Sequence, residues 1–197
     1  MDEKRRYFID RSNLPIDFPT HLHTAIFWAS LGRTVATFGL LEEVLCSAIF
    51  AFTVTRPYDE AEINEAYEQW LPKLPRTLSD TLVGLIDTFG DSVRKHPDAT
   101  FCSLAELLDN MKAASKIRNA LCHGSWRCPD DIGASIPFFV TKKNERFETP
   151  IDDAWLEQTR LHVVTLICDV INTVTQMGWQ FPGSAGPGMP IRTTNEA

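Results

Sequence analysis

The sequence lacks the excess of basic residues that proteins coating nucleic acid carry. It holds 19 lysines and arginines against 26 acidic residues, which gives a formal net charge of −7. Because neutralisation of phosphates drives non-specific binding to nucleic acid, this charge argues against a general nucleic-acid coat. A small pocket that accepts a phosphate is still compatible with it, since local charge can differ from net charge.

Paired cysteines are also lacking. The five cysteines are odd in number and none belongs to a C-x-x-C pair, which argues against a disulfide framework and against a zinc ribbon. His21, His23 and His162 have no metal-ligand spacing with one another or with Cys122 and Cys128. We therefore expect no metal and no cofactor, and a reducing cytoplasm fits this cysteine usage best.

No segment predicts export or a membrane span. Residues 1–6 include basic side chains, but no apolar run follows them directly, unlike in a signal peptide. The apolar stretch 25–54 is interrupted by Arg33, Glu42 and Glu43, and it contains no uncharged run of about 18 residues, the length that a spanning helix needs. The sequence therefore predicts a cytoplasmic protein with no membrane partner.

What the sequence does contain is helical periodicity. Apolar residues recur at spacings of three and four, which is typical of helices that bury one face. The last of these helices is expected to be capped at Thr149, with Pro150 in its first turn, and to stop at Gly178. The predicted helices before it cover residues 20–54, 59–71, 76–93 and 103–122.

Between the last two helices the pattern changes to that of a β-hairpin. Two short segments, 136–140 and 146–149, flank the polar residues 142–145, as the two strands of a hairpin flank its turn. The fold class expected is therefore a mainly α helical bundle with a small β-hairpin insertion before the last helix. We expect an N-terminal extension over 1–19, one domain over 20–181, and a disordered tail over 182–197, which is rich in glycine, proline and polar residues.

The predicted helix 103–122 places a charged residue on its apolar side, because Arg118 falls there when about 100° is counted per residue. Burying an unpaired charge costs several kcal/mol, so the arginine needs a carboxylate, a polar cleft or a partner subunit. In the helix 20–54, Glu42 falls within the apolar stripe while Glu43 falls outside it. The two positions predict a bidentate ion pair between Glu42 and Arg118. The alternatives are a purely structural salt bridge, and a Glu42 that reaches water at the edge of the stripe.

The segment Arg118-Asn119-Ala120-Leu121-Cys122-His123-Gly124 resembles the signature of HEPN domains, in which an arginine, a polar residue and then a histidine end a late helix. The order of a long first helix with an acidic residue, a motif helix, an insertion and a closing helix is similar to that family as well. The resemblance implies a helical bundle that forms a homodimer with its two motifs facing each other. It also implies a metal-independent endoribonuclease of a toxin–antitoxin or antiviral defence system, or a relative without activity that serves as an interaction module.

These residue types suit the cleavage of RNA, which carries its own nucleophile in the 2′-hydroxyl. Histidine titrates near neutrality, so His123 can take or give a proton. Arg118 can hold a phosphate through two donors, and Asn119, four residues before His123, can orient the imidazole or the phosphate. One chain supplies one such histidine, so a mechanism with two proton transfers favours a site formed by two chains.

The expected partners are a second copy of the chain, an RNA substrate such as transfer RNA, and a cognate antitoxin or defence protein. Of the neighbouring side chains, Cys122 is expected to pack in the core, and Trp126 is near enough to the motif to stack a base. A DNA-binding regulator is a weaker alternative, because no helix–turn–helix with a basic recognition face is visible.

Overall fold

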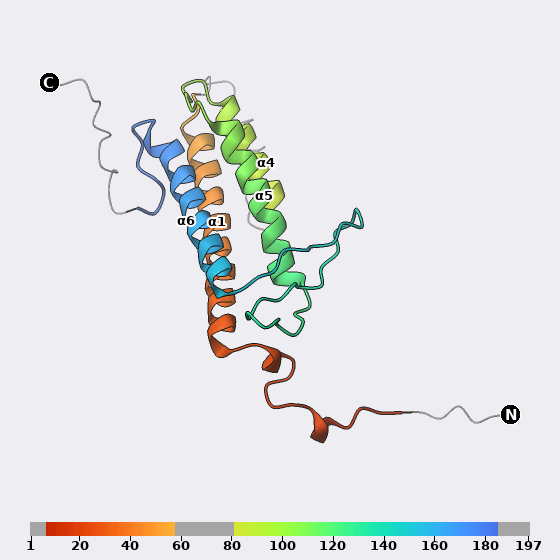
Figure 1. Cartoon of the computed structure of the whole chain (residues 1–197). Helices are drawn as coiled ribbons and strands as arrows, with labels where there is room; N and C mark the ends of the chain where they lie inside the picture. Colours follow the sequence, from red (N-terminus) through yellow and green to blue (C-terminus); the bar gives the residue numbers. More distant parts are fainter. Residues whose placement is uncertain (1–6, 58–80, 185–197) are drawn as a thin grey trace.

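Four α-helices make up most of the computed structural model, which describes residues 7–57 and 81–184 (Figure 1). The mainly helical fold confirms the prediction from periodicity. The predicted helix 59–71 and residues 76–80 of the next one lie outside the described residues, as does the tail beyond residue 184. The helices are α1 (Ala25–Val54), α4 (Leu82–Lys95), α5 (Leu104–His123) and α6 (Asp153–Thr175).

The long helix α1 is the element on which the others pack. α6 lies beside it along most of its length, α4 covers another side, and α5 reaches it more narrowly (Figure 1). Its buried residues follow the spacing of three and four that the sequence shows. They include Phe27, Leu31, Phe38, Leu41, Leu45, Ile49 and Phe52.

The starts of α1, α4 and α6 are fixed by side-chain caps, whereas α5 begins without one. Thr24, Thr81 and Asp152 each accept a hydrogen bond from the backbone N–H three residues further on, at the starts of α1, α4 and α6. Two predicted starts were therefore wrong. Residues 20–22 form a separate 3-10 turn before α1. Thr149 does not cap α6, because the chain after Thr149 is still extended at Ile151, which pairs with Ser135.

The predicted β-hairpin is not present as two strands. The chain does reverse between residues 136 and 149, but one isolated antiparallel bridge, Val140 to Arg146, joins its two sides. At the tip, the Thr141 hydroxyl accepts the N–H groups of Lys143 and Glu145, and Asn144 takes a left-handed φ of 65°. These side-chain bonds add to backbone bonds from Thr141 N–H to the Glu145 carbonyl and from Phe147 N–H to the Phe139 carbonyl.

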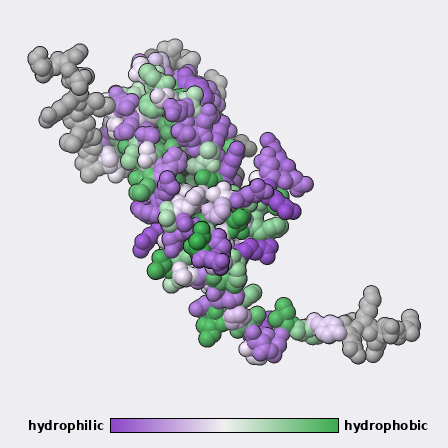
Figure 2. Space-filling model, viewed as in Figure 1, coloured by the Kyte–Doolittle hydropathy of each residue, from purple (hydrophilic) through white to green (hydrophobic). Residues whose placement is uncertain are grey.

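The apolar character of α1 extends beyond its buried side. By length and composition it is the one described helix long enough and apolar enough to cross a membrane, a test that core helices of soluble proteins also pass. In this structure, 44% of the most apolar 18-residue segment of α1 is buried inside the bundle. The N-terminal arm, residues 7–18, leaves the bundle at the start of α1 (Figure 1). It carries further exposed apolar side chains (Figure 2).

Gly90→Ala should loosen the contact between α4 and α5. A Cβ at the buried Gly90 would lie 2.7 Å from Leu108 Cδ1 and 3.2 Å from the Arg94 guanidinium. Overpacking costs about 1–3 kcal/mol, whereas replacing a helical glycine returns about 1 kcal/mol. We expect a net loss of about 1 kcal/mol, which is a fall in Tm of roughly 2–4 °C.

Thermal denaturation followed by far-UV circular dichroism measures this change. Thr88→Ala is the matched control, since Thr88 is exposed on the same helix and its loss should change stability by no more than about 0.5 kcal/mol. A Gly90→Ala variant as stable as the wild type would contradict the close approach of the two helices.

Candidate active site

The predicted pairing of Glu42 with Arg118 is present in the structure. Glu42 Oε1 lies 3.2 Å from Arg118 Nη2, so the carboxylate of α1 meets the guanidinium of α5. The geometry differs from the prediction in two ways. The pair makes one contact and not a bidentate fork, and the side chains are 30% and 31% exposed and not buried. Water therefore reaches the site, and the guanidinium keeps donors that neither Glu42 nor the core uses.

Asn119 adds a second acceptor beside the arginine. Arg118 Nη1 donates to Asn119 Oδ1 over 3.5 Å, at the long limit for such a bond. With the amide oxygen turned to Arg118, the Asn119 NH₂ group is directed elsewhere and can still donate. Glu42, Arg118 and Asn119 are thus brought together in one half-exposed group of two acceptors around one cation.

His123 is not part of this group. It is the last residue of α5 and is exposed, and among the described residues its imidazole has no hydrogen bond or ion pair. Five residues of helix separate it from Arg118, a rotation of about 140°, so the two side chains leave α5 on different sides. Within one chain, α5 therefore directs the imidazole of His123 and the guanidinium of Arg118 to different sides.

The end of α5 is fixed by Gly124. Its N–H donates to the carbonyl of Ala120 over 2.9 Å, and a Cβ at this position would lie 2.5 Å from that carbonyl oxygen and 2.6 Å from Pro137 Cβ. Any side chain here would displace either the last turn of the helix or the insertion. The glycine after the histidine in the motif thus has a steric reason, and it ties the position of His123 to that of the insertion.

Trp126 is engaged by the protein itself. Its ring meets Phe27 edge-on at 4.9 Å between centroids, and His23 and Trp28 at 5.9 and 6.3 Å. The His23 ring is further held by a bond between Nε2 and the Arg127 carbonyl, over 2.9 Å. Because α5 runs back toward the start of α1 (Figure 1), this aromatic cluster locks the segment after the motif against α1. The half-buried Trp126 therefore packs within the protein, and its stacking on a base stays a prediction.

Two cysteines lie near the site with opposite environments. Cys122, predicted to pack in the core, is exposed, because the last turn of α5 buries its other side, with Ala120 and Leu121. Cys46, one turn after Glu42 on α1, is half-buried, and burial first and then the Glu42 charge raise the pKa of its thiol.

In comparisons with known proteins, no family model matches the chain, and no curated protein or solved structure matches it. Within the described ranges 7–57 and 81–184, no group of three histidine, cysteine or acidic side chains could hold a metal ion. The likeness to HEPN domains consequently depends on the motif residues and their placement.

Glu42→Gln should lower the free energy of unfolding by no more than about 1 kcal/mol, because the pair is partly exposed and makes a single contact. It should also make Cys46 react faster with iodoacetamide, since one cause of the raised thiol pKa is removed. Thermal denaturation and mass-spectrometric mapping of alkylation measure the two effects.

Asp109→Asn is the control, as Asp109 is exposed on α5 and has no ion pair among the described residues. A loss above about 3 kcal/mol would indicate a buried pair after all. Unchanged stability together with unchanged Cys46 reactivity would remove Glu42 from the site.

Proposed function

We propose that the chain is a metal-independent endoribonuclease of the HEPN type, acting in the cytoplasm as part of a toxin or antiviral defence system. The observation that carries the proposal is the half-exposed group in which Glu42 and Asn119 hold Arg118, five residues before an exposed histidine. A guanidinium held on one side and open on the other can bind a phosphate without being reoriented.

In the proposed reaction Arg118 binds the scissile phosphate through its remaining donors, and Asn119 donates its NH₂ group to a phosphate oxygen. A histidine takes the proton from the 2′-hydroxyl, whose oxygen then attacks phosphorus and displaces the 5′-oxygen of the next nucleotide. A second histidine gives a proton to that leaving oxygen. The products are a 2′,3′-cyclic phosphate and a 5′-hydroxyl, so charge and protons balance without an oxidant or a metal.

Two histidines are needed at each site, and the geometry of one chain favours their coming from two chains. His123 leaves α5 on a different side from Arg118, so it is better placed to serve a site shared with a partner than to act on its own chain's arginine. The acidic net charge of −7 weakens general attraction to RNA. We therefore expect a selective enzyme and propose a structured RNA such as transfer RNA as the substrate.

A second candidate is an interaction module without catalysis. It is favoured by the same ion pair, because Glu42 neutralises the guanidinium and a tie between α1 and α5 explains both residues without any substrate. In that case a cognate antitoxin or defence protein would be the partner. The variants below separate the two functions.

A composite site requires a dimer. Light scattering at micromolar concentration should give at least about twice the chain mass of 22.2 kDa, since an isologous contact between two motifs buries both polar sites symmetrically. A clean monomer at high concentration would contradict a site formed by two chains.

His123→Ala should slow cleavage by about a hundredfold or more, because it removes a proton-transfer group, and Arg118→Ala should slow it comparably by removing the phosphate-binding charge. His162→Ala, at an exposed histidine of α6, and Lys116→Ala, at an exposed cation of α5, are the matched controls and should cleave normally. Gel assays on labelled transfer RNA and total cellular RNA measure the rates, and circular dichroism confirms folding.

Cleavage should persist in EDTA, leave 2′,3′-cyclic phosphate ends, and stop on a substrate with a 2′-deoxy sugar at the cleaved position. Cleavage that survives both substitutions would point to another site or a contaminant. If no cellular RNA is cleaved and expression does not slow growth, the interaction module becomes the better description.

A further inference from the structure

One side of α1 faces solvent although it is almost entirely apolar. α4, α5 and α6 cover the rest of the helix, and a helix that is apolar all round is normally covered on every side. The exposed side carries two charged residues, Arg33 and Glu43. Its other exposed residues up to position 43 are Ala25, Ile26, Ala29, Gly32, Ala36, Gly39 and Leu40.

These residues follow the spacing of a coiled-coil seam. Positions 26, 29, 33, 36, 40, 43 and 47 alternate steps of three and four, the heptad repeat by which one helix packs along another. All of them are exposed except the half-buried Ser47. A Cβ added at Gly32 or Gly39 would meet nothing within 4 Å, so small side chains leave room there for a second helix to approach closely.

The positions of Arg33 and Glu43 indicate whether that second helix runs parallel or antiparallel to α1. Arg33 and Glu43 lie symmetrically about position 38, ten residues apart, which is roughly 15 Å along the helix. An antiparallel copy of α1 centred on the same position would place Arg33 against the partner's Glu43, twice over, and Ala36 against the partner's Leu40. A parallel copy would instead place like charges together, which is unfavourable.

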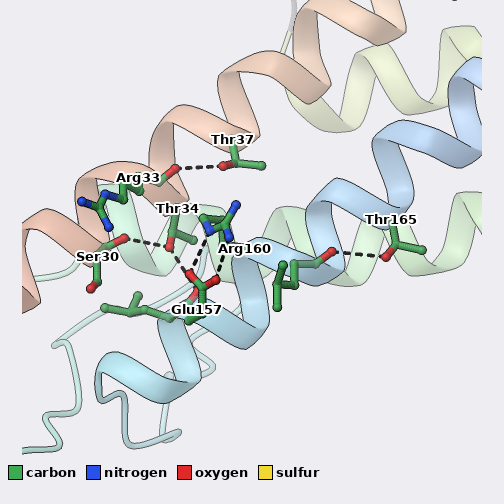
Figure 3. A network of polar contacts seen from close by, with 9 residues as sticks. Ser30, Arg33, Thr34, Thr37, Glu157, Arg160 and Thr165 are labelled. Carbon is green, nitrogen blue, oxygen red and sulfur yellow. Dashed lines mark hydrogen bonds and ion pairs between the residues drawn. The ribbon is translucent and has the colours of Figure 1, made fainter.

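Within the chain itself both charges are available for such pairing. Neither Arg33 nor Glu43 belongs to a salt bridge among the described residues; the pair formed nearby is Glu157 with Arg160, at 2.6 Å. In Figure 3 the Arg33 side chain extends from α1, and no dashed line reaches its guanidinium. Its charge is felt at Glu157, where after the bond from Arg160 it helps to lower the pKa of the carboxyl.

We propose that α1 forms an antiparallel contact with α1 of a second copy of this chain, held by reciprocal Arg33–Glu43 ion pairs across a seam of small and apolar residues. A lipid surface is the weaker occupant, because two charges in the middle of the apolar face would be costly there. Glu42 lies about 140° around the helix from Ala29 and Ser47. The seam thus leaves the pair of Glu42 with Arg118 uncovered and does not depend on the proposed ribonuclease activity.

Charge reversal tests the seam directly. Arg33→Glu and Glu43→Arg should each weaken the association of two copies through α1 at low salt. The dissociation constant of this contact should rise about tenfold or more, because attraction becomes repulsion at two symmetric places. The double variant Arg33→Glu/Glu43→Arg restores opposite charges and should return the constant to within about threefold of the wild type. Sedimentation velocity over a concentration series measures each constant.

Lys116→Glu and Asp109→Arg are the matched controls, since they make the same charge changes at exposed positions of α5 and should leave association unchanged. The proposed α1 contact would be contradicted if both single reversals left the dissociation constant unchanged, or if the double variant did not restore it. Either result would leave a motif-to-motif dimer intact. A monomeric wild type would overturn both contacts. Sedimentation of the wild type with vesicles of phosphatidylcholine and phosphatidylglycerol would assign the face to lipid and overturn the proposal.

Discussion

Burial of one side of α1 is the interaction on which the rest of the structure depends. Phe38, Leu41 and Leu45 are fully buried there, and each such side chain contributes about 1.5–3 kcal/mol relative to an exposed one. Thr34 is the polar member of this buried side. Its hydroxyl is hydrogen-bonded, because it donates to the carbonyls of Ser30 and Leu156 (Figure 3). This packing fixes α6 and α4 against α1.

The position of the candidate site follows from the same packing. Glu42 comes directly after the fully buried Leu41, so its carboxylate is delivered at the edge of the buried side, where α5 approaches. Arg118 is correspondingly at the edge of its own helix's apolar side and not in the middle. Because both residues lie at the edge of an apolar side, the pair is half-exposed. Both side chains can therefore stay charged without the cost of full desolvation.

The sequence was sufficient for the features that depend on periodicity: the described helices, the buried stripe of α1, and the meeting of Glu42 with Arg118. It was insufficient where contacts distant in the chain decide. Trp126 packs on Phe27, about a hundred residues earlier, and no local pattern announces such a pair. Cys122 is exposed because the buried side of α5 changes in its last turn to Ala120 and Leu121, and the phase of the earlier turns does not predict that change.

The separation of Arg118 from His123 within one chain changes how the motif is understood. Read along the sequence, the two residues look like neighbours in a site; on the helix they face about 140° apart. In the ribonuclease that we propose, each chain would therefore contribute to two half-sites and would not form one complete site alone. The HEPN-type activity that we propose therefore requires more than one copy of the chain.

The insertion between α5 and α6 has a consequence for protein engineering. Its base is secured at Gly124 against Pro137, by the bridge from Ser125 to Phe138 and by that from Ser135 to Ile151, whereas its tip at residues 142–145 is exposed and closes through the hydroxyl of Thr141. A loop with a secured base and a self-contained tip tolerates added length at the tip. Residues 142–145 are therefore the place to graft an epitope, a fluorophore or a surface tether without moving the motif helix.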